Sequence, residues 1–393
     1  MKTKTNFPSW PNYSKEEIKA VSKVLKLNKV NYWTGNECKI FEKEFSDWSN
    51  SDYSIALSNG TVALDLALRA LAISKGDEVI VTPRSFIASV SSVVQCGATP
   101  VFADIEKDTG NLSARTIAKK LTKKTKAVIC VHLGGIPCEM DQIMDLAKKR
   151  KIYVIEDCAQ AHGAKYKGVS VGSIGHIGAW SFCQDKIMTT GGEGGMVTTN
   201  NKALWKSMWS YKDHGKDFES VNRPNKDNKF KWVHNSFGTN FRMTEMQGAL
   251  GRYQLNKMKS WNKLRIRNGK RIEKIFEKFE GSIEFYRYPE YIHPAYYRAY
   301  GYIEPGKLKK SWSRDLIIKK INEEGIPCFS GSCPEIYREK AFSKLRIGKQ
   351  ERLKNAKLLG ETSIAFLCHP NLRICDLRVV EQKVTKIFNA AFR

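Results

Sequence analysis

Short apolar runs alternate with amphipathic segments between about residues 50 and 200. The segments 61–73 and 140–150 carry apolar residues at helical spacing. The remaining runs are almost continuously apolar, as strands buried on both faces of a parallel sheet are; they cover residues 77–81, 99–105, 126–133, 152–158, 178–183 and 194–199. This alternation predicts an α/β fold with a mostly parallel, doubly wound sheet, in which ligands bind at the carboxyl ends of the strands.

The pattern changes after residue 200. Residues 215–236 are polar and follow neither a helical nor a strand period. An irregular segment of about 20 residues inside a compact domain is uncommon and often functional. Helical spacing resumes over 243–280 and returns at 314–325. We therefore expect a large domain over residues 1–260, including an N-terminal arm, and a smaller C-terminal α+β domain over residues 261–393.

Composition is that of a folded globular protein. The 393 residues are 41% hydrophobic and include nine tryptophans, enough for a large core. No apolar run approaches the roughly 18 to 20 residues that span a bilayer, and the first 17 residues contain no run typical of a signal peptide. We expect a cytoplasmic protein without membrane insertion.

The ten cysteines are scattered along the chain, and no two form a CxxC pair. A chain of this length is not a small disulfide scaffold. Several stand in apolar runs, such as Cys130 in AVICVHL, where a free cysteine behaves as a small hydrophobic residue. We expect structural thiols and no metal site.

The formal net charge is +26. Charge alone supports only non-specific binding of nucleic acid. The densest basic runs, 119–126 and 148–151, stand at the ends of predicted helices, where cations interact favourably with the helix dipole. Because no nucleic-acid-binding motif accompanies them, we expect no specific nucleic-acid partner. The same positive charge can also attract anionic substrates.

Asp157 ends the predicted strand 152–158, which places a carboxylate at the carboxyl edge of the sheet. An acid there can simply begin a loop. A magnesium ligand of a P-loop enzyme is excluded, because the nearest match, GYIEPGKL (301–308), lacks Ser or Thr after Lys307 and follows no clear strand.

The segment SNGTVAL (58–64) is typical of a helix N-terminus. The free N–H groups and the positive dipole end of a helix can bind a phosphate, although capping alone also explains these residues. A dinucleotide-binding fingerprint is absent, because no strand, GxGxxG and helix follow one another in this chain.

Lys186 follows the predicted strand 178–183 and so also lies at the carboxyl edge. The usual pKa of a lysine amine is about 10.4, so the amine is mostly charged at neutral pH. A lysine at this edge can form a Schiff base if its surroundings favour the neutral amine. The downstream glycines of GGEGG (191–195) let backbone approach a flat ligand. Together with Asp157 and the helix start at 58–64, Lys186 predicts pyridoxal 5′-phosphate (PLP), whose ring accepts electrons when an aspartate keeps its nitrogen protonated.

The chain resembles the PLP-dependent nucleotide-sugar aminotransferases of the DegT/StrS type, which have the aspartate-aminotransferase fold (fold type I). Matching segments run in order along essentially the whole chain: SNGTVALDLAL, GDEVIVTPRSFIAS, GATPVFADI, KAVICVHLGG, VIEDCAQAHGAKYKG, VGSIG, SFCQDK, GGEGGMV, DHG and GTNFRMTEMQGALG.

The resemblance implies a role for each matching residue. Lys186 corresponds to the lysine that holds PLP as a Schiff base and then carries protons. Asp157 corresponds to the partner of the pyridine nitrogen, Gln160 to the residue beside the 3-hydroxyl and Phe86 to the aromatic residue that stacks on the ring.

Gly60, Thr61 and Ser181 correspond to phosphate-binding positions in the same family. Asn240 corresponds to an asparagine that reaches the phosphate of the neighbouring subunit. The resemblance therefore implies a homodimer with shared active sites.

The reaction implied is transfer of an amino group from L-glutamate, through pyridoxamine phosphate, to a nucleotide-linked keto sugar such as a 4-keto-6-deoxyhexose, for surface-glycan biosynthesis. One alternative is a pyridoxamine-phosphate-dependent sugar dehydratase of the same fold, but these enzymes carry histidine where Lys186 stands. The other alternative is a non-enzymatic, nucleic-acid-binding regulator, which rests on net charge alone.

The chain departs from the family in two places. Cys183, Gln184 and Asp185 precede the lysine where relatives commonly have an aromatic residue or histidine followed by small or neutral residues, and an acidic neighbour favours a charged amine unless it points away. Residues 327–342 differ from the family segment that helps to line the sugar site. Both departures concern the identity of the substrate rather than the chemistry.

Overall fold

The computed structural model describes residues 7–224, 230–343 and 351–393. Their helices are α1 (Lys15–Lys26), α2 (Glu37–Ser49), α3 (Gly60–Ala70), α4 (Ala88–Gln95), α5 (Ala114–Ala118), α6 (Met140–Arg150), α7 (Lys202–Lys212), α8 (Phe218–Asn222), α9 (Glu245–Glu277), α10 (Arg314–Glu323), α11 (Lys340–Ser343), α12 (Lys354–Thr362) and α13 (Ile374–Ala391). Their strands are β1 (Tyr53–Leu57), β2 (Glu78–Val81), β3 (Thr99–Phe102), β4 (Thr125–Val131), β5 (Tyr153–Asp157), β6 (Lys165–Tyr166), β7 (Val169–Ser170), β8 (Ile177–Ser181), β9 (Gly195–Thr199), β10 (Ile283–Glu284), β11 (Ile292–His293), β12 (Arg298–Ile303), β13 (Cys328–Phe329) and β14 (Ser363–Leu367).

The central sheet of the described residues has seven strands in the order β1-β9-β8-β5-β4-β2-β3. Four neighbouring pairs, from β8 to β3, are parallel. Only β9 runs the other way, antiparallel to both β1 and β8. The prediction of a mostly parallel α/β sheet is confirmed, and all six predicted strands are present.

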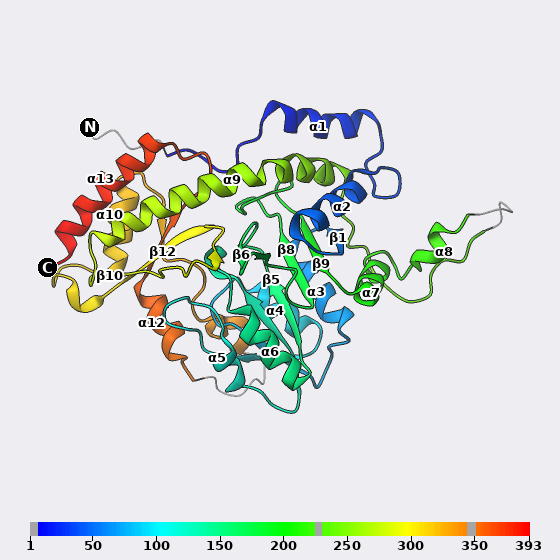
Figure 1. Cartoon of the computed structure of the whole chain (residues 1–393), viewed down its shortest axis with the longest axis horizontal. Helices are drawn as coiled ribbons and strands as arrows, with labels where there is room; N and C mark the ends of the chain where they lie inside the picture. The colour runs from blue at the N-terminus through cyan, green and yellow to red at the C-terminus, as the bar shows by residue number, and fades with distance from the viewer. Residues whose placement is uncertain (1–6, 225–229, 344–350) are drawn as a thin grey trace.

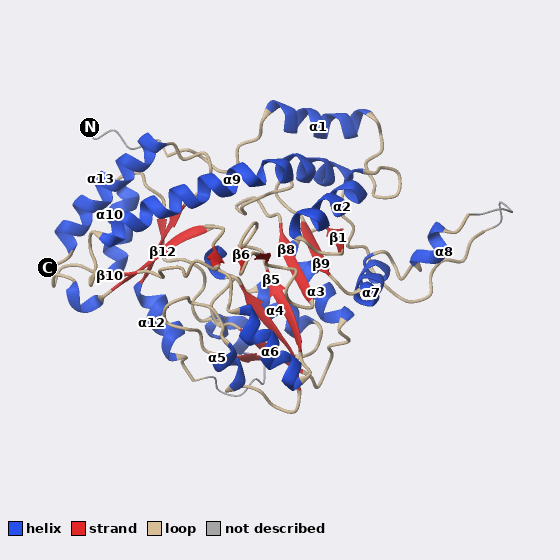
Figure 2. Cartoon of the chain, in the orientation of Figure 1, coloured by secondary structure: helices blue, strands red, loops and turns tan. Residues whose placement is uncertain are grey.

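Helices cover both faces of this sheet, as strands without a polar face require. One apolar core joins the sheet to α3, α4 and α6. A second core, rich in aromatic residues such as Phe45 and Trp180, lies between the sheet and helices α2 and α9. Figure 2 shows the strands in the middle of the molecule with helices around them.

The C-terminal part has its own core. An antiparallel sheet in the order β10-β12-β14-β13 packs with α10, α13 and the end of α9 around Phe276, Phe366 and Phe388. Helix α9 runs without interruption from Glu245 to Glu277 across the molecule (Figure 1). The predicted domain boundary at residues 260 and 261 therefore falls inside one helix, and the division into domains stays a prediction.

The polar segment 215–236 contains a short helix, α8, and a bridge between Lys216 and His234; its residues 225–229 lie outside the described residues. In Figure 1, α8 projects from the body of the molecule beside α7. The polar composition of this segment did not predict α8. The start of the helix depends on the side chain of Asp217, which accepts a hydrogen bond from the Ser220 N–H.

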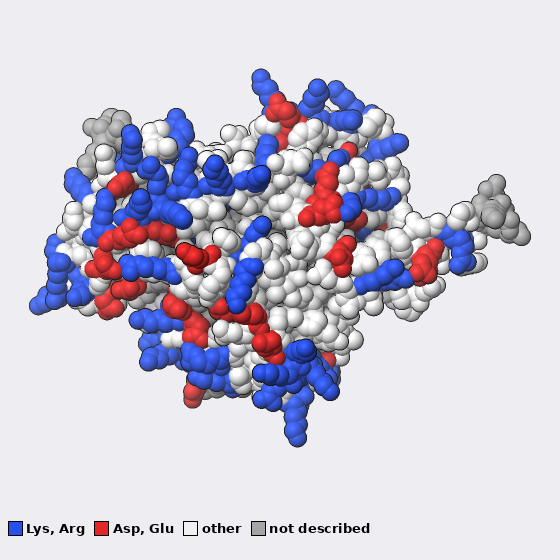
Figure 3. Space-filling view, in the orientation of Figure 1, with Lys and Arg blue, Asp and Glu red and all other residues white. Residues whose placement is uncertain are grey.

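Basic side chains lie on many elements of the face in Figure 3, with acidic side chains between them, rather than as one continuous stripe. All ten cysteines are free thiols, and six of them are buried. Among the described residues, no helix is both long and apolar enough to cross a membrane.

Candidate active site

Strands β5 and β8 bring the predicted catalytic residues to one edge of the sheet. They are parallel and place Asp157 opposite Ala179, two residues before Ser181. A cavity of about 650 Å³, which we call the lysine cavity, opens at this edge. Seven of the eight predicted site residues line it: Gly60, Thr61, Phe86, Asp157, Gln160, Ser181 and Lys186.

Asp157 is 5% exposed, and protein groups fix its orientation. Oδ2 accepts a hydrogen bond from Ser89 Oγ at 2.7 Å, and Oδ1 accepts one from the Ala159 N–H at 3.1 Å. Burial raises the pKa of Asp157, and the hydrogen bond from Ser89 and the charge of Lys186 oppose that rise only in part. A buried carboxylate without a close cationic partner gains from a cationic group placed against it.

Lys186 extends its amine into the same cavity, and its side chain is 15% exposed. Nζ lies 3.6 Å from Asp185 Oδ1 and 5.1 Å from the centre of the Tyr297 ring. Burial lowers the pKa of Lys186, but Tyr297, Asp185, Cys183 and Asp157 together raise it by more, so the net shift is upward. Asp185 therefore does not point away, and these surroundings favour the charged amine.

Helix α3 begins at Gly60, and the side chain of Asn59 caps it by accepting from the Val62 N–H at 3.0 Å. The first N–H groups of a helix have no partner inside it, so an anion can bind them. A Cβ on Gly60 would lie 2.5 Å from Cβ of Ser181, and one on Gly195 would lie 2.3 Å from the carbonyl oxygen of Asn59. The start of α3 thus packs against β8 and β9 only because both positions are glycine.

Gln160 and Phe86 complete the lining. The side-chain oxygen of Gln160 accepts from the Gly134 N–H at 2.8 Å, which fixes its orientation. Phe86 follows β2 and is 66% exposed, so it is not a core aromatic residue but one with a free face at the cavity. The helix start, the exposed ring, the buried carboxylate and the lysine fit a flat, phosphorylated carbonyl compound such as PLP.

Asn240 does not line the lysine cavity. It is exposed, pairs with Asp213 in an isolated antiparallel bridge, and accepts from the Arg242 N–H at 3.3 Å. Its predicted role concerns the neighbouring subunit, so this placement leaves that role a prediction.

The predicted site residues did not include Ser89, Tyr297 or Arg298. Ser89 lies one turn beyond Phe86 and looks like any polar residue of a helix start. Tyr297 donates a hydrogen bond to Asp185 Oδ2, and Arg298 Nη2 lies 3.9 Å from the same oxygen. Arg298 begins β12 of the C-terminal sheet and Tyr297 directly precedes it, more than 100 residues after Asp185. The aromatic cluster YYRAY (296–300) was the only signal in the sequence.

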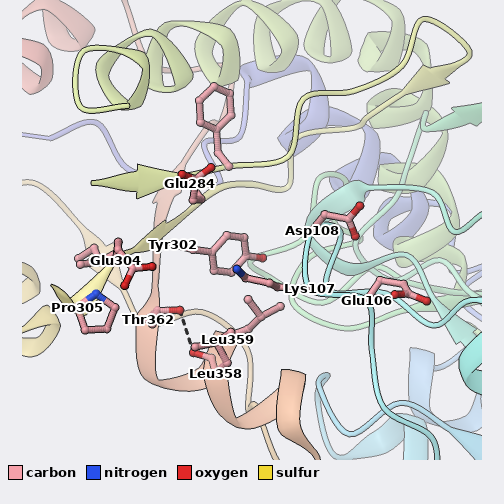
Figure 4. Close-up of a pocket in the computed structure, with 12 residues that line it drawn as sticks. Glu106, Lys107, Asp108, Glu284, Tyr302, Glu304, Pro305, Leu358, Leu359 and Thr362 are labelled. Atoms are coloured by element: carbon pink, nitrogen blue, oxygen red, sulfur yellow. Dashed lines mark hydrogen bonds between the residues drawn. The ribbon is translucent and has the colours of Figure 1, made fainter. Parts of the chain in front are cut away.

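A second cavity of about 650 Å³ lies between the loop 106–108 and elements β12 and α12 (Figure 4). Its acids flank Tyr302, whose hydroxyl accepts from Arg84 at 3.3 Å, and Glu106 already accepts from Ser113 and Arg115. None of the predicted site residues lines it. Its lining offers no lysine paired with a buried carboxylate, so the lysine cavity is the better candidate.

His132, Glu156 and Cys158 form a buried group whose side-chain atoms lie within 4.8 Å of one another. Glu156 accepts from the N–H groups of residues 172, 174 and 175 and contacts His132 Nε2 at 3.0 Å. His132 Nδ1 accepts from the Cys138 N–H, so Nε2 carries the hydrogen. Glu156 lies in β5, and its oxygens therefore hold the loop after β7 against this strand.

The fold is that of an aminotransferase. The structure of the aminotransferase from Psychrobacter cryohalolentis matches with a TM-score of 0.96 and 55% sequence identity, over 98% of this chain and 99% of that one. The family model of the DegT/DnrJ/EryC1/StrS aminotransferase family matches residues 11–385. The chain belongs to this family.

Two further relatives have named activities. The GDP-perosamine synthase of Escherichia coli O157:H7 is 47% identical over 221 residues, which are 56% of this chain and 58% of that protein. The dTDP-3-amino-3,4,6-trideoxy-alpha-D-glucose transaminase of Streptomyces venezuelae is 36% identical over 62% of this chain and 60% of that protein. The chain thus spans less than two thirds of the length of either relative.

Proposed function

We propose that this protein is a PLP-dependent aminotransferase that transfers an amino group from L-glutamate to a nucleotide-linked keto sugar. One observation carries the proposal: the amine of Lys186 and the buried carboxylate of Asp157 line one cavity beside the start of α3. Family membership supports transamination, and the names of the two relatives above support a nucleotide sugar as acceptor.

Each cavity residue has a part in holding the cofactor. Gly60, Thr61 and Ser181 would bind the phosphate, Asp157 the ring nitrogen and Phe86 the ring face. When bound, PLP supplies a carbonyl that exchanges amines and a ring that withdraws electrons from the carbon bearing the amine.

Lys186 performs two tasks in this proposal. Its amine must first lose the proton that Asp185 and Tyr297 help it to keep, because only a neutral amine attacks a carbonyl. The free amine would also serve in the cavity as a general base that accepts a proton and returns it. Asp157 would hold the ring nitrogen of PLP and keep it protonated, which requires the carboxylate to be ionised.

Further parts of the proposal come from the family resemblance. The protein would act as a cytoplasmic homodimer with Asn240 reaching the partner's phosphate site, aminate a 4-keto-6-deoxyhexose, and serve surface-glycan biosynthesis. The dehydratase alternative is disfavoured by Lys186, since those enzymes carry histidine at this position.

The test is amine transfer with a panel of acceptors. The PLP-loaded protein is incubated with L-glutamate and keto sugars linked to GDP, UDP or dTDP, and the products are weighed by mass spectrometry. We expect one amino sugar nucleotide from the wild type and the exposed control Lys202→Ala, and none from Lys186→Ala. Equal product from Lys186→Ala would contradict the proposal, and so would a wild type that aminates no member of the panel.

A further inference from the structure

A cavity smaller than the two described above adjoins the lysine cavity. Its volume is about 350 Å³, and Asp185 lines both cavities, so this one carboxylate stands between them. We call it the arginine cavity, because Arg265 of α9 and Arg298 of β12 lie in its wall. The N-terminal segment around Trp10 and the C-terminal residues Phe329 and His369 close it on the other sides.

Both guanidinium groups have nitrogen atoms without a hydrogen-bond partner among the described residues. Arg265 is 2% exposed; Nε and Nη2 have no hydrogen-bond partner, and Nη1 makes one long bond of 3.4 Å to the Tyr296 carbonyl. Arg298 Nη1 is also buried without a partner, and Nη2 is 3.9 Å from Asp185 Oδ2. Buried donors left unpaired are costly, which indicates that the site is built for an acceptor other than these protein groups.

The charges around this cavity do not balance. Among the described residues that line it, Asp185 is the sole acid, and it also faces Lys186. Burial, together with the charge of Arg265, lowers the pKa of His369 to about 4, so this ring is neutral at pH 7. Burial lowers the pKa of Arg265 to about 10, which still leaves it charged. Lys186 and Arg298 thus face the same carboxylate, whereas Arg265 has no acid against it in this lining. An anion entering the cavity gains from both arginines.

Aromatic rings hold the guanidinium groups in place. The Arg298 guanidinium carbon lies 4.7 Å from the Phe329 ring and 5.0 Å from the Tyr297 ring, and that of Arg265 lies 5.1 Å from the Trp10 ring. A guanidinium fixed between rings presents its N–H groups in a rigid fork that matches a carboxylate or a phosphate.

We propose that Arg298 and Arg265 bind a carboxylate of the amino-acid donor, and that Asp185 is the counter-ion of Arg298 while the donor is absent. The inference rests on the proposed function, since only a transaminase needs such a donor. An α-amino acid carries a carboxylate on the same carbon as its amine, so one molecule can reach both Arg298 and the atoms beside Lys186. In a sugar nucleotide the phosphate is separated from a keto carbon by part of the sugar ring, which fits this short spacing less well.

The test measures binding rather than turnover. Glutarate, a dicarboxylate without an amine, is titrated calorimetrically into the PLP-loaded protein and into Arg298→Met, Arg265→Met, Arg298→Lys and the exposed control Arg287→Met. We expect Kd for glutarate to rise at least about tenfold in both methionine variants and less in Arg298→Lys, which keeps the charge but not the fork. Arg287→Met should match the wild type, and Kd for GDP should not change in any variant.

The results separate the possibilities. Unchanged glutarate affinity in a folded Arg298→Met or Arg298→Lys, checked by near-ultraviolet circular dichroism, overturns the inference. So does loss of GDP affinity with glutarate affinity retained, which would make the cavity a phosphate site. A wild type that binds no glutarate also overturns it. Failure to take up PLP contradicts the proposed function instead, and it is read from the visible absorbance before any titration.

Discussion

Asp185 places its carboxylate 3.6 Å from the amine of Lys186, and the hydroxyl of Tyr297 donates to the same carboxyl group. The residue directly before the lysine, together with Tyr297, therefore raises the pKa of its amine. This pair also joins the two cavities, so the feature that departs from the family motif in sequence lies at the centre of the site in space.

Asp185→Asn should lower the pKa of Lys186, because Asp185 is among the groups that raise it. A larger fraction of the amine is then neutral at a given pH, so uptake of PLP should become faster at pH 7 to 8. The rate of growth of the visible band, followed from pH 6 to 10, should have its midpoint at lower pH than in the wild type. Asp145→Asn, at an exposed position, is the control; a midpoint that stays in place or moves to higher pH would disprove the role of Asp185.

Asp157→Asn should stabilise the protein without added PLP at neutral pH. Burial raises the pKa of Asp157 above its unfolded value, so its contribution to stability is fully present below the unfolded pKa of about 3.9 and is lost as the pH rises through the folded pKa. Asparagine avoids this loss, since its oxygen can accept from the Ala159 N–H and its amide can donate to Ser89 Oγ. The Ser89 hydroxyl can then donate to Ser85 Oγ, 2.8 Å away.

Urea unfolding at several pH values checks this expectation. The variant should be more stable at pH 7, and the difference should shrink as the pH falls toward 4. A variant less stable than the wild type at pH 7 would show that the carboxylate is not penalised by burial. The same variant should bind PLP yet exchange amines far more slowly, because a neutral amide does not hold the ring nitrogen protonated.

Gly60→Ala should weaken both folding and cofactor binding. The added methyl group would lie 2.5 Å from Cβ of Ser181, so α3 or β8 must shift. Overpacking of this kind costs about 1–3 kcal/mol, and the phosphate-binding N–H groups move with the helix. Urea unfolding and titration with PLP measure the two effects. Gly306→Ala is the matched control, since its nearest atom would be a glutamate oxygen at 3.7 Å; equal PLP affinity in both variants would show that the start of α3 does not contact the cofactor.

Glu156→Gln should destabilise the fold while leaving the chemistry of the lysine cavity in place. Both oxygens of Glu156 accept two hydrogen bonds each, from three backbone N–H groups and His132. An amide nitrogen in place of either oxygen faces two donors, at a cost of about 1–3 kcal/mol for each group left unpaired. The free energy of unfolding from urea titration should fall accordingly, whereas the exposed control Glu290→Gln should change little. A stability equal to that of the wild type would mean that the loop is fastened elsewhere.

Much of the fold follows from local patterns in the sequence. The six buried strands are continuous apolar runs, and the residues that end them fix which side chains reach the carboxyl edge. The pattern does not show direction, so β9 looks like its neighbours although it runs antiparallel to them. Strand β1, with Tyr53 and Ser54 at its start, is too short and polar to stand out; it is specified by pairing with β9.

The site likewise contains residues that local sequence patterns predict and residues that only long-range packing places. Lys186, Asp157 and the start of α3 stand at element ends within the central sheet, where a sequence pattern locates them. Tyr297 and Arg298 come to Asp185 only through the packing of the C-terminal sheet on α9. Long-range packing of this kind leaves no periodic signal, so the sequence does not predict the arginine cavity.

The most direct test of the central claim is to locate the lysine that PLP modifies. The protein is incubated with PLP, reduced with borohydride, digested and mapped by mass spectrometry, with Lys186→Ala and Lys202→Ala treated in parallel. We predict one phosphopyridoxyl group on Lys186 in the wild type and in Lys202→Ala, and none at a defined position in Lys186→Ala. Modification spread over exposed lysines, or concentrated on a lysine other than Lys186, would contradict the account.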